Sequence, residues 1–334
     1  MSATLIYKNR PRLAARASTV GPKEGKGPLA AHFDVILPDD LLGQASWELA
    51  EGLMLQQTME KCIERGGLAA GDVEAVLSGD LINQLMPSGL AARALAAPFF
   101  GLYGACSTAI EAIALGAALV DGGYRKNALC GASSHFCTAE RQYRFPLELG
   151  NQRPPSAQWT ATAAGAFLID GGREKAVATV THATVGRVVD YQITDANHMG
   201  AAMAPSVADT IDAHFRDTGR TFADYDLVAT GDLGLIGREL LIELLERRGV
   251  RVNADRLIDC GARLFGPDQG CNAGGSGCGC VASVTAGYLL SLVERGQVER
   301  LLVIGSGALV SSTSAQQGQS IPGVAHAVAL EKGV

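Results

Sequence analysis

Apolar and polar positions follow two periodicities along the chain, and the same order of segments occurs twice. In each half a segment with helical spacing precedes a short apolar strand that ends in Gly-Asp-Leu, and a helix of small residues and a buried strand follow. Glycines at 122, 123 and 296 end the small-residue helices. We predict helices at residues 46–65, 107–120, 208–218 and 278–295, and strands at 75–78, 127–131, 227–230 and 301–305. Strands that alternate with helices predict α/β units with parallel or mixed sheets.

Three stretches of the first half resemble three stretches of the second half, in the same order. Residues 18–21 match 183–186, residues 72–81 match 224–233, and residues 118–123 match 291–296. The last match continues into strands that end at 131–133 and 305–307. An ordered repeat of this kind predicts a duplicated architecture. We place the two halves at residues 1–172 and 173–334, with the boundary in the charged, turn-rich stretch 170–175.

Composition agrees with two packed units and excludes several classes of function. The chain has 334 residues, of which 41 are glycine and 47% are hydrophobic, while its net charge is −6. An acidic chain has no overall basic field, so nucleic acid is not expected as a partner. The uncharged run 94–110 contains a proline and two glycines and is short for a bilayer span, so no transmembrane helix and no signal peptide are predicted.

The eight cysteines are predicted to be free thiols in a reducing compartment. Cys271, Cys278 and Cys280 cluster near a glycine-rich segment, and a zinc site is the alternative interpretation there. No CxxC pair or histidine motif accompanies them, so we predict packed small residues and no metal site.

The residues around Cys106 resemble a known superfamily. A cysteine in a glycine-flanked turn that opens a helix, within a tandem α/β duplication, is similar to the thiolases and ketoacyl synthases. The strings at residues 132–135, 139–146, 152–160, 195–200 and 230–234 further resemble the stage V sporulation protein AD family. The resemblance spans nearly the whole chain, and it implies a thiolase-like fold with two duplicated α/β halves packed as a layered αβαβα core.

The same resemblance implies a role without catalysis in bacteria that form endospores. Members of the family bind dipicolinic acid (pyridine-2,6-dicarboxylate) or its calcium chelate, and they serve its uptake into spores and its release in germination. The resemblance implies other SpoVA membrane proteins as partners and a peripheral location at the cytoplasmic face of the forespore or spore inner membrane. It also implies a homodimer and no cofactor, except calcium carried with the ligand.

The chain keeps one part of a condensing-enzyme site and lacks two others. Such an enzyme needs a cysteine nucleophile and two polar groups, His with His or Asn, that activate it and hold the oxyanion. Cys106 fits, and we expect the amides of Ser107 and Thr108 to point at its sulfur and favour a thiolate. Cys271 stands where the thiolase motif has histidine, and no histidine follows the strand that leads to Asp232. We therefore predict that condensation chemistry is lost.

The remaining scaffold is predicted to bind an anion in the crevice between the halves. We place one ligand carboxylate near Cys106 and Ser107, with His135 as a second donor. Arg141 and Arg144 are the predicted cationic partners, because a guanidinium matches a carboxylate with two hydrogen bonds. The alternatives are that the arginines form ordinary salt bridges and that His135 is a structural histidine.

Two further residues complete the predicted site. Asp232 would repel a bare dicarboxylate but would assist if calcium accompanies it. Its counterpart Asp80 in the first half leaves open that this turn is structural. Cys271 is included because it replaces the motif histidine. The rival functions are an acyltransferase or acyl-CoA-dependent condensing enzyme that uses Cys106 as nucleophile, and a structural subunit with a vestigial pocket.

Overall fold

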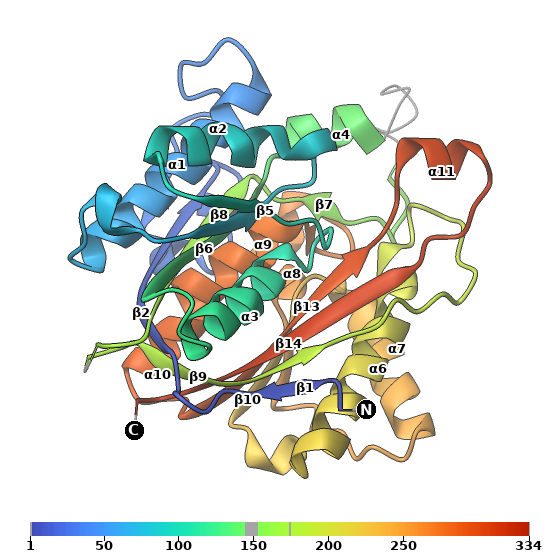
Figure 1. Cartoon of the computed structure of the whole chain (residues 1–334). Helices are drawn as coiled ribbons and strands as arrows, with labels where there is room; N and C mark the ends of the chain where they lie inside the picture. The colour runs from blue at the N-terminus through green and yellow to red at the C-terminus, as the bar shows by residue number, and fades with distance from the viewer. Residues whose placement is uncertain (1, 144–152, 174, 334) are drawn as a thin grey trace.

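The computed structural model describes residues 2–143, 153–173 and 175–333, and most of its strands form one long mixed sheet (Figure 1). Ten of the strands follow one another in hydrogen-bonded order: β11 (Leu257–Asp259), β10 (Leu227–Thr230), β13 (Arg300–Ala308), β14 (Gly323–Glu331), β9 (Ala178–Val185), β2 (Arg12–Val20), β8 (Ala163–Asp170), β6 (Asn127–Ser134), β4 (Val76–Gly79) and β5 (Phe99–Gly101). Two short strands lie off this path, since β1 (Thr4–Ile6) pairs with β9 and β3 (Val35–Ile36) with β2.

The two halves of this sheet have the same topology. Outward from the centre, the first half runs β2, β8, β6, β4, β5 and the second runs β9, β14, β13, β10, β11. In both halves the second strand is antiparallel to both of its neighbours, and the outer three strands are parallel. β2 and β9 join the halves through a short antiparallel pairing at Arg12 and Leu13. The predicted duplication of an α/β unit is therefore confirmed, whereas the boundary at residues 172 and 173, in the turn from β8 to β9, stays a prediction.

Helices cover the sheet in layers. α1 (Trp47–Arg65) and α2 (Met86–Leu95) pack on the outer face of the first half, and α6 (Met199–Thr218) and α7 (Gly234–Arg247) cover the second half. α3 (Thr108–Asp121) and α9 (Cys278–Val284) lie between the halves and contact each other and strands of the sheet. Among the described residues, no helix is long and apolar enough to cross a bilayer.

Several glycines let the central helices approach the sheet closely. A Cβ on Gly165 of β8 would lie 2.4 Å from the backbone of Ala282 in α9. A Cβ on Gly307 of β13 would lie 2.1 Å from the carbonyl oxygen of Gly104, in the turn before α3. Real Cβ atoms do not tolerate such distances, so the glycine excess is a requirement of the layered packing.

The predicted elements lie close to the observed ones, with three differences. The helix predicted at 208–218 begins earlier, at Met199, and contains Pro205, because burial against β13 and β14 supports a run of small residues that has weak helical signals of its own. The helix predicted at 278–295 changes at a π-helical turn, Thr285–Leu289, before α10 (Leu290–Glu294). In the polar stretch 311–319, for which no helix is predicted, Ser311 caps a short helix, α11 (Ser312–Gln316).

Candidate functional site

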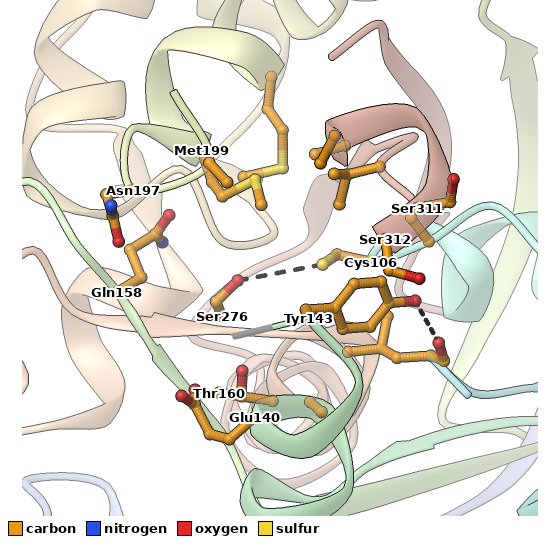
Figure 2. Close-up of a pocket in the computed structure, with 18 of the residues that line it drawn as sticks. Cys106, Glu140, Tyr143, Gln158, Thr160, Asn197, Met199, Ser276, Ser311 and Ser312 are labelled. Carbon is orange, nitrogen blue, oxygen red and sulfur yellow. Dashed lines mark hydrogen bonds between the residues drawn. The ribbon is translucent and has the colours of Figure 1, made fainter. Parts of the chain in front are cut away.

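A cavity of about 280 Å³ lies where the two halves meet (Figure 2). Residues of both halves line it: Leu81, Tyr103, Ala105, Cys106, Ala139, Glu140, Tyr143, Gln158 and Thr160 from the first, and Ala196, Asn197, Met199, Met203, Ser276, Ala308, Val310, Ser311, Ser312 and Ala315 from the second. Apolar side chains form much of the wall, and hydroxyl, amide, thiol and carboxyl groups interrupt it. This mixture is typical of a small-molecule site.

Cys106 lies in a tight turn between β5 and α3. Ala105, just before it, has a left-handed φ of 50°, which an alanine adopts only at some cost. The hydroxyl of Ser107 donates to the carbonyl of Gly104 at 2.7 Å, and the hydroxyl of Thr108 donates to the carbonyl of Ala105 at 2.7 Å. These bonds hold the turn so that Cys106, 8% exposed, reaches the cavity wall.

The expectation that Cys106 is a thiolate is wrong. The amides of Ser107 and Thr108 donate to the carbonyls of Gly104 and Ala105, at 3.0 and 3.3 Å, rather than to the sulfur. Burial raises the pKa of Cys106 well above its ordinary value, and the nearby carboxylate of Asp232 raises it further. At neutral pH the group at the cavity wall is therefore a neutral thiol.

Asp232 reaches the cavity through Ser276. The hydroxyl of Ser276 donates to the carboxylate of Asp232 at 3.0 Å, and its oxygen lies 4.0 Å from the Cys106 sulfur. The Gly277 amide and the Ser306 hydroxyl donate to the same carboxylate, at 2.8 and 2.9 Å. Burial raises the pKa of Asp232 to about 6, while the Cys106 thiol, the Gly277 amide and the Ser306 hydroxyl oppose the shift. Asp232 is a buried acceptor behind the wall rather than part of it.

A two-stranded ribbon fixes the position of Ser276. β7 (Trp159–Thr160) from the first half pairs in parallel with β12 (Gly275–Ser276) from the second, which sets Thr160 opposite Ser276. The side-chain amide of Gln158 donates to the carbonyls of Asp232 and Gly275, at 2.6 and 2.8 Å. The ribbon thus ties the two halves together at the cavity and presents two hydroxyls side by side.

Glu140 supplies the carboxylate of the described wall. It lies on α4 (Phe136–Tyr143) and forms an ion pair with Arg153 at 2.7 Å, in which both side chains are mostly buried. The Arg153 guanidinium also lies 4.7 Å from the ring centroid of Trp159 and 5.4 Å from that of Phe136. These contacts orient Arg153 against Glu140, so that the pair is held rigidly.

Two tyrosines form the side of the cavity near α4 and β5. The hydroxyl oxygens of Tyr103 and Tyr143 are 3.2 Å apart, and Tyr143 donates to the carbonyl of Leu81. Their rings give the cavity flat, apolar surfaces with polar edges, which suit an aromatic ligand.

The predicted donors His135, just before α4, and Arg141, on α4, do not line the cavity. His135 is buried, and its Nε2 donates to the carbonyl of Asp40 at 2.8 Å, while its Nδ1 accepts from the Cys137 amide at 3.1 Å. Arg141, with a side chain 52% exposed, forms an ion pair with Glu48 on α1. Arg141 thus forms an ordinary salt bridge and His135 is a structural histidine, as the alternative interpretation states. Burial lowers the pKa of His135, so its ring is neutral.

Of the other predicted residues, two lie at the cavity and the remaining ones do not line it or are not described. Cys106 lines the cavity, and Asp232 is one hydrogen bond behind it. Ser107 is buried within the turn, and Cys271 is buried outside the lining, with a pKa that burial raises to about 11. Arg144 lies outside the described residues. The structure therefore brings together Cys106 and Asp232 and separates them from His135, Arg141 and Cys271.

Sequence reasoning missed most of the polar wall. Glu140, Tyr143, Gln158 and Asn197 occur inside the strings on which the family resemblance was based, but His135, Arg141, Arg144 and Asp232 were the residues of those strings predicted as ligands. The sequence signal that could have pointed to these residues is that the unusual strings that contain them lie in separate segments of the chain. Ser276 had no such signal, because its position depends on the pairing of β7 with β12.

The electrostatics of the described wall are acidic to neutral. No lysine or arginine is among its described lining residues, and the Arg153 guanidinium beside the wall is bound to Glu140. Within residues 2–143, 153–173 and 175–333, no group of three or more His, Cys, Asp or Glu side chains is arranged to hold a metal ion.

Comparison with known proteins agrees with this architecture. The model of the family "Stage V sporulation protein AD" matches residues 1–331. The chain is 41% identical over 329 residues to stage V sporulation protein AD of Bacillus subtilis (strain 168), which covers 98% of this chain and 96% of that protein. Among solved structures, 3-oxoacyl-[acyl-carrier-protein] synthase III of Aquifex aeolicus VF5 is similar with a TM-score of 0.58 at 12% identity, covering 96% of this chain and 99% of its own. Human mitochondrial 3-ketoacyl-CoA thiolase has a TM-score of 0.59 at 13% identity, covering 98% and 99%.

The two solved structures support the fold alone, and they confirm the predicted thiolase-like class. The family match covers nearly all of the chain, as does the relative at 41% identity. The chain therefore belongs to the stage V sporulation protein AD family.

Proposed function

We propose that the cavity binds dipicolinic acid as its calcium chelate and that the protein acts as a binding protein rather than an enzyme. One observation carries the choice of the chelate. The described wall offers hydroxyl and amide oxygens and the Glu140 carboxylate, but no lysine or arginine among its described residues.

The charge balance favours the chelate over the free dianion. A buried dianion needs cationic partners to replace its hydration, whereas one calcium ion neutralises dipicolinate before it enters. Calcium also prefers oxygen ligands, which Glu140, Asn197 and Ser276 carry. The rings of Tyr103 and Tyr143 would lie against the pyridine ring.

The biological role follows from the family. We infer that the protein serves dipicolinate uptake into spores and its release in germination, together with SpoVA membrane proteins at the spore inner membrane. The similarity to a Bacillus subtilis stage V sporulation protein supports a role in sporulation. The membrane partners and the location rest on the resemblance.

The surroundings of Cys106 support binding rather than catalysis. Its thiol is neutral at physiological pH, and no histidine is among the described lining residues to take up its proton. A condensing enzyme needs such a base to generate the thiolate nucleophile.

Calorimetric titration tests the proposal. Wild-type protein should bind dipicolinate more tightly with calcium present than with a chelator that removes it. Glu140→Gln should weaken binding of the chelate about tenfold, because a calcium ligand is lost. Glu48→Gln is the matched control, since Glu48 also pairs with an arginine but lies outside the cavity. Equal binding with and without calcium would refute the chelate, and no binding at all would refute the function.

An acyltransferase remains a second candidate because of the chain of groups behind Cys106. Ser276 lies between the Cys106 sulfur and the Asp232 carboxylate, so a proton could pass from thiol to carboxylate through the hydroxyl. Intact mass after incubation with acyl-CoA tests this function. An acyl adduct that is absent in Cys106→Ala would favour the enzyme over the binding protein.

A further inference from the structure

We propose a second binding site, on the surface where the two halves join, that takes the phosphate group of an organic anion. A pocket of about 510 Å³ lies there, apart from the Cys106 cavity. Three cationic side chains line it, Arg12, Lys175 and Lys332, together with Ala14, Ala176, Val177, Val293, Glu294 and Gly333.

Segments far apart in the sequence bring the three cations together. Arg12 begins β2, Lys175 precedes β9, and Lys332 follows β14 near the chain end marked C in Figure 1. The amide of Val177 donates to the carbonyl of Leu13 at 2.9 Å, which holds the Lys175 segment against β2.

The backbone and a glycine fix Lys332. Its amide donates to the carbonyl of Glu299 at 2.8 Å. Its amine lies so close to Gly296 that a Cβ there would be 2.5 Å from Nζ. The pocket is therefore formed by well-defined segments of both halves and not by one loose loop.

The acidic residue of this lining does not neutralise the cations. Glu294 forms an ion pair with Arg16, whose side chain is only 11% exposed. Arg12 donates to the Thr179 hydroxyl, and its cross-strand neighbour Asp170 pairs with Arg173 at 3.4 Å. Lys175 and Lys332 form no ion pair with any described residue. Like charges that converge around a hollow favour a multivalent anion.

The pocket wall indicates the class of anion. Two ammonium groups and a guanidinium on different sides match the oxygens of a phosphate, which points in several directions, better than one flat carboxylate. Ala14, Val177 and Val293 form an apolar floor that would contact an organic body. A lipid headgroup and a soluble phosphate ester share this chemistry.

Binding of glycerol 3-phosphate tests the site directly. We expect the double variant Lys175→Gln, Lys332→Gln to bind it at least tenfold more weakly than wild type, with an unchanged thermal midpoint. The matched control is Lys26→Gln, Lys61→Gln, which removes the same charge from lysines outside the pocket and should leave the affinity unchanged. Equal loss in both double variants would overturn the proposal, because it would reflect net charge alone.

A vesicle arm separates the two sources of phosphate. Sedimentation with vesicles that contain phosphatidylglycerol, but not with pure phosphatidylcholine vesicles, identifies a headgroup site if Lys175→Gln, Lys332→Gln abolishes it. Saturable binding of glycerol 3-phosphate without vesicle binding identifies a soluble ester. Failure of the wild type to bind either probe overturns the site. Dipicolinate titration of the same variants should be unchanged, so this test is independent of the proposed function of the Cys106 cavity.

Discussion

The same Gly-Asp-Leu turn occurs in both halves of the molecule, and its aspartate has different hydrogen-bond partners in each. Asp80 follows β4 and Asp232 follows β10, which occupy equivalent places in the duplicated sheet. Both carboxyl groups are fully buried. Asp80 accepts hydrogen bonds from the Ile82 amide and from the amide and hydroxyl of Ser88, all within its own turn and the start of α2.

Asp232 instead accepts from segments distant in the sequence. Its donors are Ser276, Gly277 and Ser306, of which Ser276 lines the Cys106 cavity. In the second half, Asp259 caps the start of α7 instead. It accepts from the amides of Leu233 and Gly234 at 2.8 and 2.9 Å. Because another carboxylate satisfies the helix start, Asp232 is available to the site. The second copy of the turn thus lies behind the Cys106 cavity, whereas the first is bonded within its own segment.

The largest effect should come from Asp80→Ala. The substitution leaves two amides and a hydroxyl buried without an acceptor, and we expect the free energy of unfolding to fall by about 4 kcal/mol. Urea denaturation measures this loss. The alkylation rate of Cys106 under native conditions should stay the same. A stable Asp80→Ala protein with altered Cys106 reactivity would reverse the roles assigned to the two turns.

The second largest effect should be the contribution of Asp232 to the pH dependence of the free energy of unfolding. Its folded pKa of about 6 exceeds the ordinary value of 3.8, so the folded state binds this proton more tightly. The resulting stability is present below about pH 4 and is lost as the pH rises through 6, a change of about 3 kcal/mol. The unfolding free energy of wild type, minus that of Asp232→Asn, should fall by this amount between pH 4 and 7.

Two other buried carboxyl groups cancel in that comparison, whereas Asp259, which helps to raise the pKa of Asp232, titrates together with it. Burial raises the pKa of Glu24 and Glu51 to about 7 and about 8, but both are present in both proteins and cancel in the difference. Asp255→Asn, at an exposed position, is the control. Parallel curves for wild type and Asp232→Asn would contradict the assigned burial.

The rates of thiol alkylation compare the cysteines at the starts of the two central helices, α3 and α9. Cys106 precedes α3 at the cavity, whereas Cys278 begins α9, is fully buried and donates to the carbonyl of Ser133. Iodoacetamide should modify Cys106 about tenfold faster than Cys278, since Cys278 reacts only after local opening. The Cys106 rate should also rise steadily up to pH 9, because its pKa is raised. Peptide mass spectrometry measures both rates, and a plateau near pH 7 would indicate a thiolate.

The smallest effects should come from Ser276 and Ser88, the serines whose hydroxyls donate to Asp232 and Asp80. Ser276→Ala removes a polar group from the cavity wall and should weaken dipicolinate binding about fivefold, or roughly 1 kcal/mol, as a neutral hydrogen bond does. Ser88→Ala removes the equivalent hydroxyl beside Asp80 and should change stability by a similar amount without changing affinity. Titration calorimetry and denaturation of both variants give the four values. Weaker binding in Ser88→Ala alone would place the ligand near the other turn.

Local signals in the sequence predicted four strands and four helices close to their observed places, but not the central strands β2, β8, β9 and β14. The predicted strand at 227–230 is β10, and Ser46 caps α1 as the helical pattern indicates. The repeat anticipated the equal strand order of the two halves. Cys106 was found for the same reason, since a cysteine at a glycine-flanked helix start is a local motif. The thiolate expectation failed because it treated the Ser107 and Thr108 amides as unused, whereas the turn uses them internally.

The sequence by itself determined the duplication, the α/β class and the cysteine at the junction, because each depends on periodicity or on adjacent residues. Only the tertiary structure decided which polar groups surround that cysteine. Ser276, Gln158 and Glu140 reach the cavity through the pairing of β7 with β12 and the packing of α4, and His135 and Arg141 are directed elsewhere. The physical reason is that the direction and ionisation of a side chain depend on partners and burial contributed by segments distant in the chain.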